Sequence, residues 1–243
     1  KLGLDVERAL LDRMGNPELA FPCIHIAGTN GKGSVAVLLH SILMAAGFRV
    51  GLYTSPHLVR FNERIRVNDR EITDAELAAL FEKTEPHVAA VARPGRESTF
   101  FECTTAMAFE YFRAQRVQMA VLETGLGGRL DATNVVTPLI SIITRISIEH
   151  TAYLGKDMES IAGEKSGIIK AGRPVVCGAM EEEALQVVRK TAGRLGSRIV
   201  EASQVVSIRP LSHDLDGQKL NVETTGTSYG TMRLPLAGLH QIE

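Results

Sequence analysis

Short apolar runs alternate along most of the chain with longer stretches in which apolar residues recur every three or four positions. The short runs predict buried strands, and the longer stretches predict helices that pack one face against a core. The predicted strands cover 23–27, 50–54, 118–122, 139–144 and 174–177. The predicted helices cover 5–14, 33–46, 74–92, 102–115, 156–170 and 181–195. This alternation predicts a doubly wound α/β fold with a mostly parallel sheet.

Two parts of the chain depart from that alternation. Residues 62–67 alternate as an exposed strand does, and Asp69-Arg70 follows as a turn. After Arg198, three further alternating runs are separated by glycine-containing turns, and they cover 204–209, 220–225 and 229–236. They predict a small antiparallel sheet, spanning about 198–237, appended to the main sheet.

The composition is that of an ordinary globular protein. The 243 residues suffice for one large domain, with 44% hydrophobic residues and a formal net charge of −1. We therefore expect no nucleic-acid or membrane partner and, by default, a monomer. Three widely spaced cysteines predict free thiols and a cytoplasmic setting. Since the chain opens without Met and ends without a polar tail, we expect it to be part of a longer protein.

The turn between the predicted strand 23–27 and helix 33–46 has the composition of a phosphate-binding loop. It reads Gly28-Thr29-Asn30-Gly31-Lys32-Gly33-Ser34. Glycines let backbone N–H groups point at an anion, the helix N-terminus adds a partial positive charge, and Lys32 adds a full one. The Ser34 hydroxyl is placed to ligate Mg²⁺. These features favour a nucleoside triphosphate site over a glycine-rich surface turn.

Four polar residues fall at predicted strand ends, where ligands bind in open α/β sheets. They are Ser34, Ser55, Glu123 and His150. Glu123 ends an apolar run, where nucleotide-hydrolysing folds place the carboxylate that binds a metal, and Mg²⁺ prefers hard oxygen ligands. The alternative for Glu123 is a solvated strand-end carboxylate. His150 on its own is more typical of a structural histidine.

A second glycine-rich segment lies between two predicted buried strands. It reads Gly125-Leu126-Gly127-Gly128-Arg129-Leu130-Asp131-Ala132-Thr133-Asn134. Its glycines permit close backbone approach to a ligand, and Arg129 and Asp131 add opposite charges. This pattern indicates a ligand-binding segment rather than a flexible connection. Lys165, by its spacing alone, is typical of a solvated lysine on a helix.

In five ordered segments the chain resembles the folylpolyglutamate synthases and dihydrofolate synthases of the Mur ligase superfamily. The segments are 25–34, 53–58, 122–134, 150–155 and 162–167. Ile26 and Gly33 interrupt the common phosphate-loop (P-loop) pattern, but a glycine between Lys32 and Ser34 is itself typical of this family. The resemblance runs over essentially the whole chain. It implies that 1–243 is a Mur-ligase-like ATP-binding domain.

The resemblance implies an ATP- and Mg²⁺-dependent ligase that adds L-glutamate to dihydropteroate, to reduced folates, or to both. ATP would phosphorylate a substrate carboxylate, and the glutamate amine would attack the acyl phosphate. Phosphoryl transfer needs mainly positioning and neutralisation of charge, which a phosphate loop with a metal supplies. The family also has a C-terminal glutamate-binding domain that this chain lacks, so 1–243 alone is expected to be inactive.

The resemblance assigns ATP and metal contacts residue by residue. Lys32 and the N–H groups of its loop would hold the β- and γ-phosphates. Ser34 and Glu123 would bind one Mg²⁺, while Ser55, Glu123 and His150 would bind a second. His150 would then be a catalytic residue, together with Lys32 and Lys165, rather than a structural histidine.

Further roles implied by the resemblance concern Lys165 and the substrate. Lys165 matches a lysine that CO₂ carbamylates in this family, which requires an amine with a depressed pKa. Phe101 offers a face on which a planar ring can stack. Contacts to pterin and aminobenzoate map to Leu2, Gly3, Thr99, Phe101, Glu102, Leu130, Asp131 and Ala132.

Some features depart from the family, and two other classes of protein stay open. Glu149 stands where the family often has Asp before the metal histidine, and the asparagine that recognises adenine would fall beyond Glu243. A Mur-superfamily ligase that acts on a nucleotide-linked sugar is one alternative, which the order Lys32-Gly33-Ser34 disfavours. A non-ligase nucleotide switch is the other, but the chain has no Asn-Lys-x-Asp motif for guanine.

Overall fold

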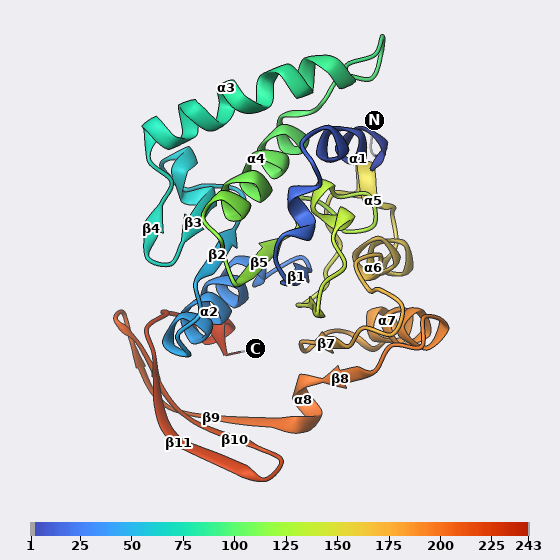
Figure 1. The fold of residues 1–243 in the computed structure, drawn as a ribbon. Coiled ribbons are helices and arrows are strands. Elements are labelled where there is room, and N and C mark those ends of the chain that lie inside the picture. Colours follow the sequence, from blue (N-terminus) through green and yellow to red (C-terminus); the bar gives the residue numbers. More distant parts are fainter. Residues whose placement is uncertain (1–2, 243) are drawn as a thin grey trace.

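The computed structural model describes residues 3–242 (Figure 1). The strands of its main sheet are β1 (Cys23–Ala27), β2 (Val50–Tyr53), β3 (Ile65–Val67), β4 (Arg70–Glu71), β5 (Met119–Glu123), β6 (Ile140–Ile143), β7 (Val175–Cys177) and β8 (Ile199–Glu201). Their order across the sheet is β4-β3-β2-β5-β1-β6-β7-β8. All neighbours from β2 to β8 pair in parallel, whereas β3 pairs antiparallel with β2 and with β4. The predicted α/β fold with a mostly parallel sheet is confirmed.

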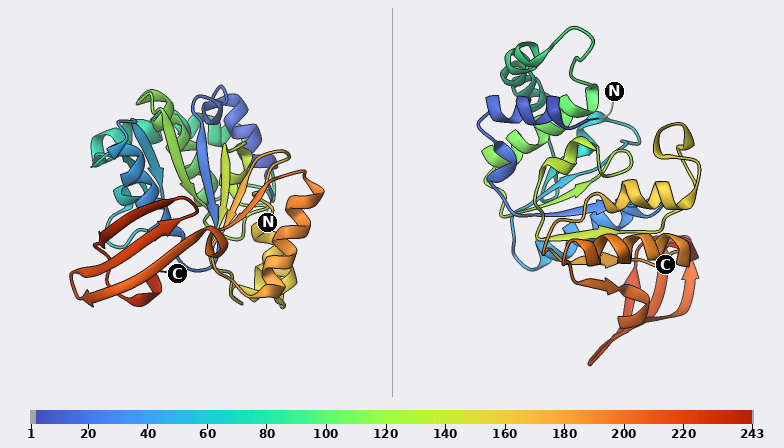
Figure 2. Two further views of the ribbon diagram at one scale, coloured as in Figure 1. Left: turned by 90° about the horizontal axis from the view of Figure 1, so that it is seen from below. Right: turned by 90° about the vertical axis from the view of Figure 1, so that its right-hand side faces the viewer.

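The helices connect these strands and cover both faces of the sheet (Figure 2). They are α1 (Asp5–Arg13), α2 (Lys32–Ala45), α3 (Asp74–Val91), α4 (Phe100–Ala114), α5 (Thr151–Leu154), α6 (Met158–Ser166), α7 (Glu182–Arg194) and α8 (Ala202–Val205). Short 3₁₀ turns are η1 (Pro17–Leu19), η2 (Phe61–Arg64), η3 (Ala132–Val135) and η4 (Leu239–Gln241). No helix among the described residues is both long and apolar enough to cross a bilayer.

Alternating side chains on the central strands divide the core between the two faces. On β5, Leu122 packs into a cluster with α1, α3 and α4, while its neighbour Val121 packs with α2 on the opposite face. A third cluster joins β6 and β7 to α6 and α7. Because the central strands are buried on both faces, they read in the sequence as continuous apolar runs.

Several boundaries differ from the predicted ones. The alternating stretch 62–67 begins as the turn η2, and Arg70 starts β4 instead of ending a turn. The predicted helix 156–170 is shorter: α6 begins after Asp157, whose side chain accepts from Ser160 N at 2.7 Å, and ends at Ser166, before Gly167. By contrast, Thr99 and Glu102 form the predicted capping box at the start of α4.

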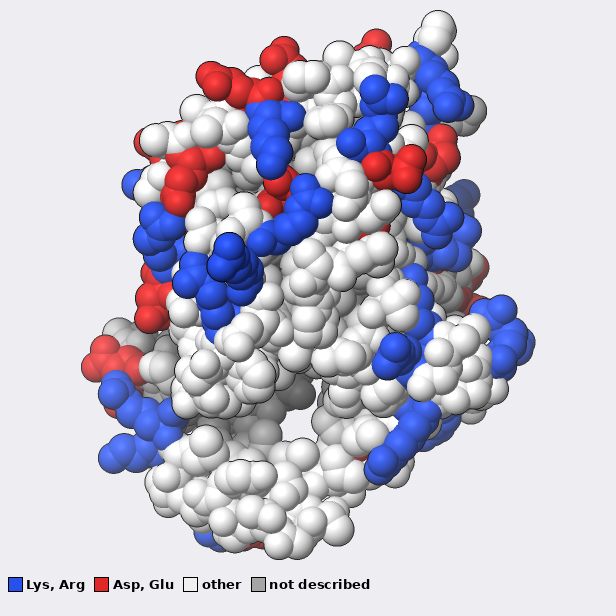
Figure 3. All heavy atoms as spheres, viewed as in Figure 1, with Lys and Arg blue, Asp and Glu red and all other residues white. Residues whose placement is uncertain are grey.

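The small antiparallel sheet is present but starts later than the sequence indicates. Its strands are β9 (Val206–Asp214), β10 (Gly217–Thr224) and β11 (Thr227–Leu234), in the order β11-β10-β9. The residues just after Arg198 form β8 instead, which extends the parallel sheet beside β7. In the space-filling view an opening separates the small sheet from the body of the molecule (Figure 3).

Candidate functional site

The loop from Gly28 to Gly31 joins β1 to α2 and is anchored to the segment after β6. Thr29 N donates to Arg145 O at 2.8 Å, and the Thr29 hydroxyl is bonded to Ser147 O and Ser147 N, both at 3.0 Å. Gly28 has φ +149°, and a Cβ on it would lie 1.8 Å from Thr144 Oγ1. Only glycine therefore fits where this loop passes the end of β6.

Lys32 and Ser34 lie in the first turn of α2, at the mouth of this loop. Lys32 Nζ donates to Thr29 O at 3.0 Å, so the ammonium is folded back over the loop. Ser34 is half-buried. The backbone N–H groups of a first helical turn have no partner within the helix, and together with the ammonium they suit a polyanionic ligand.

Glu123 ends β5 with a buried carboxylate next to the turn at Ser55. Ser55 N donates to Glu123 Oε2 at 3.1 Å. Burial raises the pKa of Glu123, and the bond from Ser55 and the charge of Lys32 oppose this effect only in part. A cation near this carboxylate would relieve the cost of burying its charge. Its hard oxygens, with the hydroxyl of Ser34 or Ser55, fit the preference of Mg²⁺.

The side chain of Lys165 extends from α6 into the interior and contacts the phosphate loop at Gly28. Its side chain is 1% exposed, and its ammonium donates to Gly28 O at 2.8 Å and to Glu149 Oε1 at 2.7 Å. Burial lowers the pKa of Lys165, as predicted, although the ion pair with Glu149 opposes the shift. Burial alone would raise the pKa of Glu149, but the bond from Lys165 outweighs it and the pKa is lowered.

His150 lies at the edge of this group. Its Nε2 is 3.9 Å from Glu149 Oε2, and its side chain is 55% exposed. No hydrogen bond or ion pair within residues 3–242 joins it to Glu123 or Ser55. Within the same residues, no group of three or more His, Cys, Asp or Glu side chains could hold a metal ion. A shared metal between His150 and Glu123 stays a prediction.

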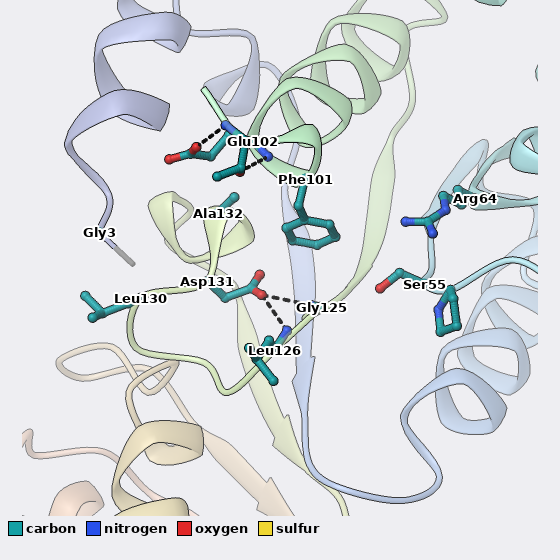
Figure 4. Close-up of a pocket in the computed structure, with 12 residues that line it drawn as sticks. Gly3, Ser55, Arg64, Phe101, Glu102, Gly125, Leu126, Leu130, Asp131 and Ala132 are labelled. Carbon is teal, nitrogen blue, oxygen red and sulfur yellow. Dashed lines mark hydrogen bonds between the residues drawn. The ribbon is translucent and has the colours of Figure 1, made fainter. Parts of the chain in front are cut away.

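A pocket of about 420 Å³ opens beside the turn at Ser55 (Figure 4). It is lined by Gly3, Ser55, Pro56, Arg64, Thr99, Phe101, Glu102, Gly125, Leu126, Leu130, Asp131 and Ala132. Every predicted substrate contact within the described residues lines this one pocket. Leu2 lies outside the described residues. The structure thus brings together residues that are far apart in the sequence, and their role in binding stays a prediction.

The carboxylates of Asp131 and Glu102 lie at one end of this pocket, and they accept hydrogen bonds from the backbone segments that line it. Asp131 Oδ2 accepts from Gly125 N and Leu126 N at 2.9 and 2.8 Å, which shapes the glycine-rich segment. Burial raises the pKa of Asp131 although these bonds oppose the shift. Glu102 accepts from Thr99 N at 2.7 Å and from Arg96 Nη2 at 3.1 Å.

A second cavity, of about 430 Å³, adjoins the first. Ser55 and Pro56 line both cavities, and Gly33 and Glu123 line the second. The two cavities therefore meet at the turn that donates to the Glu123 carboxylate. Of the residues 28–34, Gly33 alone lines the second cavity, so this cavity reaches the start of α2 on the other side of the turn.

The sequence patterns do not single out Arg64 or Arg96. Arg64 lines the pocket, and Arg96 ties Gly3 O and Asp5 to Glu102 with distances of 3.1–3.3 Å. Both arginines lie in stretches that resemble solvated surface, and neither belongs to a motif. Only the close approach of distant segments distinguishes them.

Buried His25 makes the stability of the fold depend on pH. It is fully buried on β1, its Nε2 bonds Thr133 Oγ1 at 2.8 Å, and burial lowers its pKa to about 3. The unfolded chain takes up this proton near pH 6.5, so stability falls as the pH drops from 6.5 toward 3, by about 1.4 kcal/mol per unit. The free energy of unfolding of each protein is measured by urea unfolding at pH 7 and at pH 5. The decrease from pH 7 to pH 5 should be about 2 kcal/mol smaller in His25→Gln than in the parent chain. Equal losses in both proteins would contradict this assignment.

These features define an α/β domain with a glycine-rich loop between β1 and α2 and a pocket of about 420 Å³ beside the turn at Ser55. Residues 26–243 match the Mur ligase middle domain. The chain therefore belongs to the Mur ligase middle domain family.

Several individual proteins are similar to this chain in sequence or in structure. The chain is 42% identical over 243 residues to the dihydrofolate synthase/folylpolyglutamate synthase of Bacillus subtilis, covering 99% of this chain and 56% of that protein. Folylpolyglutamate synthase from Thermotoga maritima superposes with a TM-score of 0.92 at 42% identity, covering 100% of this chain and 56% of the other. A structure described as an FPGS–AMPPCP–folate complex gives a TM-score of 0.92 at 36% identity, covering 99% and 60%. The chain thus spans little more than half the length of these relatives.

Proposed function

We propose that this chain is the ATP-binding part of a ligase that joins L-glutamate to dihydropteroate, to reduced folates, or to both. The observation that carries the proposal is the turn at Ser55 and Pro56, which lines both the pocket and the cavity beside the phosphate loop. A carboxylate held in the pocket next to this turn would face the terminal phosphate of a bound nucleotide. The relatives named as folylpolyglutamate synthases, one of them solved with AMPPCP and folate, support the same substrates.

The reaction follows from the chemistry of an unreactive carboxylate. An oxygen of the substrate carboxylate attacks the γ-phosphorus of ATP, the bond to the bridging oxygen of ADP breaks, and an acyl phosphate forms. The amine nitrogen of glutamate then attacks the acyl carbon, phosphate leaves, and the nitrogen loses a proton to give the amide. Lys32 and the N–H groups of the loop would hold the phosphates throughout, because phosphoryl transfer depends on positioning and on neutralised charge.

The proposal includes Mg²⁺ at the end of β5. The buried Glu123 carboxylate and the hydroxyls of Ser34 and Ser55 offer the hard oxygen donors that this ion prefers. Bound there, Mg²⁺ would neutralise charge on the β- and γ-phosphates.

A second Mg²⁺ near His150 and a carbamylated Lys165 are finer parts of the same proposal. Lys165 Nζ is ion-paired with Glu149 here, so a carbamate at this position would put two anions side by side. Glu149 would have to turn away, or a cation would have to lie between the two groups. Intact-protein mass spectrometry in bicarbonate with ATP bound tests the modification, which adds one CO₂.

The glutamate and adenine contacts would come from sequence outside this chain. We therefore expect residues 1–243 alone to be inactive, and we expect the full-length protein to act as a monomer. Glutamate ligation by purified 1–243 would contradict the first expectation.

The test of the proposed function is phosphate release from ATP by the full-length protein, with pteroate or folate and glutamate omitted in turn. A ligase needs ATP, the acid and glutamate together, and mass spectrometry should show a product longer by one glutamyl residue. Comparing dihydropteroate with tetrahydrofolate shows which acid is accepted. Phosphate release that needs neither the acid nor glutamate would favour a simple nucleotide switch instead.

A further inference from the structure

The pocket has one charged group that the proposed contacts leave unused. Among its lining residues in the described chain, Arg64 alone is a cation. Glu102 and Asp131 lie at the far end of the pocket, Arg64 and Ser55 lie at the near end, and the ring of Phe101 is between them (Figure 4). The lining carboxylates therefore lie at the end of the pocket away from Arg64, and one of them, Glu102, is ion-paired with Arg96, which does not line the pocket.

The Arg64 guanidinium is held in place from three directions. Its Nε donates to His57 Nδ1 at 2.9 Å, and its Cζ lies 5.7 Å from the ring centre of Phe61 and 5.6 Å from that of Phe100. Aromatic faces attract a guanidinium and fix its plane. These contacts fix the orientation of the guanidinium and do not involve its outer nitrogens, Nη1 and Nη2.

Those outer nitrogens are available to a ligand. Within residues 3–242, no protein acceptor receives a hydrogen bond from Nη1 or Nη2 of Arg64, and no carboxylate forms an ion pair with it. The nearest carboxylate in the sequence, Glu63, is engaged by backbone N–H groups of residues 58–60 at 2.6–2.8 Å. Glu71 lies 3.7 Å from Arg60 instead. A planar fork with two open donors matches the two oxygens of a carboxylate.

We propose that Arg64 binds a carboxylate of the substrate through its Nη atoms and so sets the direction in which the substrate lies in the pocket. The inference rests on the proposed function. A ring rich in N–H donors would then lie at the Glu102 and Asp131 end, and the acid end would lie beside Ser55. Two carboxylates have the required chemistry: the one that is phosphorylated, and the non-reacting α-carboxylate of a folate that already carries glutamate.

The test uses Arg64→Met, Arg64→Lys and, as a matched control, Arg60→Met in the full-length protein. Arg60 is exposed and lines neither cavity, and within residues 3–242 its side chain forms one ion pair, at 3.7 Å, with Glu71. Arg64→Met should raise KM for the acid substrate about 10–100-fold, the value of a charged hydrogen-bonded contact. Arg64→Lys should restore part of the loss, because it returns the charge but not the fork, and Arg60→Met should leave KM unchanged.

Two comparisons separate binding from a structural role. A substrate analogue without the carboxylate should inhibit the parent protein and Arg64→Met equally, whereas equal weakening of the analogue and the acid would overturn the inference. If Arg64→Met raises KM for both dihydropteroate and tetrahydrofolate, Arg64 binds the reacting carboxylate. If it raises KM for tetrahydrofolate alone, Arg64 binds the α-carboxylate. An active parent protein with an unchanged KM in Arg64→Met overturns this inference alone, whereas an inactive parent contradicts the proposed function.

Discussion

Glu123→Gln is expected to lower kcat of the full-length protein by about 10²–10³-fold while leaving the fold intact. Glutamine has the same shape, and its amide oxygen can still accept the bond from Ser55 N. It cannot carry the negative charge that would hold a cation against the phosphates. Glu123 is only 4% exposed, so solvent cannot compensate for the missing negative charge.

The measurement compares steady-state ligation by Glu123→Gln with that by Glu71→Gln. Glu71 is a surface carboxylate with a 3.7 Å contact to Arg60, so its neutral replacement should retain full activity. Thermal unfolding of both variants shows whether each is folded. Activity of Glu123→Gln within tenfold of the parent would remove Glu123 from the proposed machinery.

The largest expected loss of stability comes from Gly167→Ala at the end of α6. A Cβ there would lie 2.3 Å from Arg129 Cβ and 2.5 Å from Arg129 Cα, so the glycine-rich segment would have to move away from the helix. Overpacking at such a contact costs about 3 kcal/mol, which corresponds to a fall in Tm of about 6–12 °C for a chain of this size.

The same helix offers a matched control, Gly163→Ala. No heavy atom lies within 4 Å of a Cβ built on Gly163, which is within α6. Alanine should therefore stabilise the helix there by up to about 1 kcal/mol. Scanning calorimetry of both variants should show Tm changes of opposite sign. A fall of similar size in both would mean that the contact with Arg129 is not the cause of the loss.

The fold was largely predictable because its strongest elements carry local signals. The buried strands are continuous apolar runs, and Thr99 with Glu102 caps α4 as their spacing predicts. The sequence did not predict the short strands that form only by pairing with a neighbouring strand. The residues of β8 and β4 are too few to show a period, and they are strands only because β7 and β3 offer an open edge.

The candidate site was predictable where glycines and strand ends mark it. The loop at Gly28 and the carboxylate of Glu123 fall where the pattern indicates, and the contacts expected of the substrate line one pocket. Arg64 could not be found in this way, because an arginine in an alternating stretch is usually solvated. Its role as a pocket residue depends on Phe100 and on His57, which the fold brings to it from outside η2.

The contact between the glycine-rich segment and α6 joins the pocket to the loop at Gly28. Arg129 N donates to Glu164 O at 2.8 Å, and the next residue of the helix, Lys165, donates to the carbonyl of Gly28. If a molecule entering the pocket shifts the segment, these two hydrogen bonds connect that shift, through α6, to the loop at Gly28. Thermodynamic linkage then requires reciprocity: whatever factor the first ligand applies to the affinity of the second, the second applies to the first.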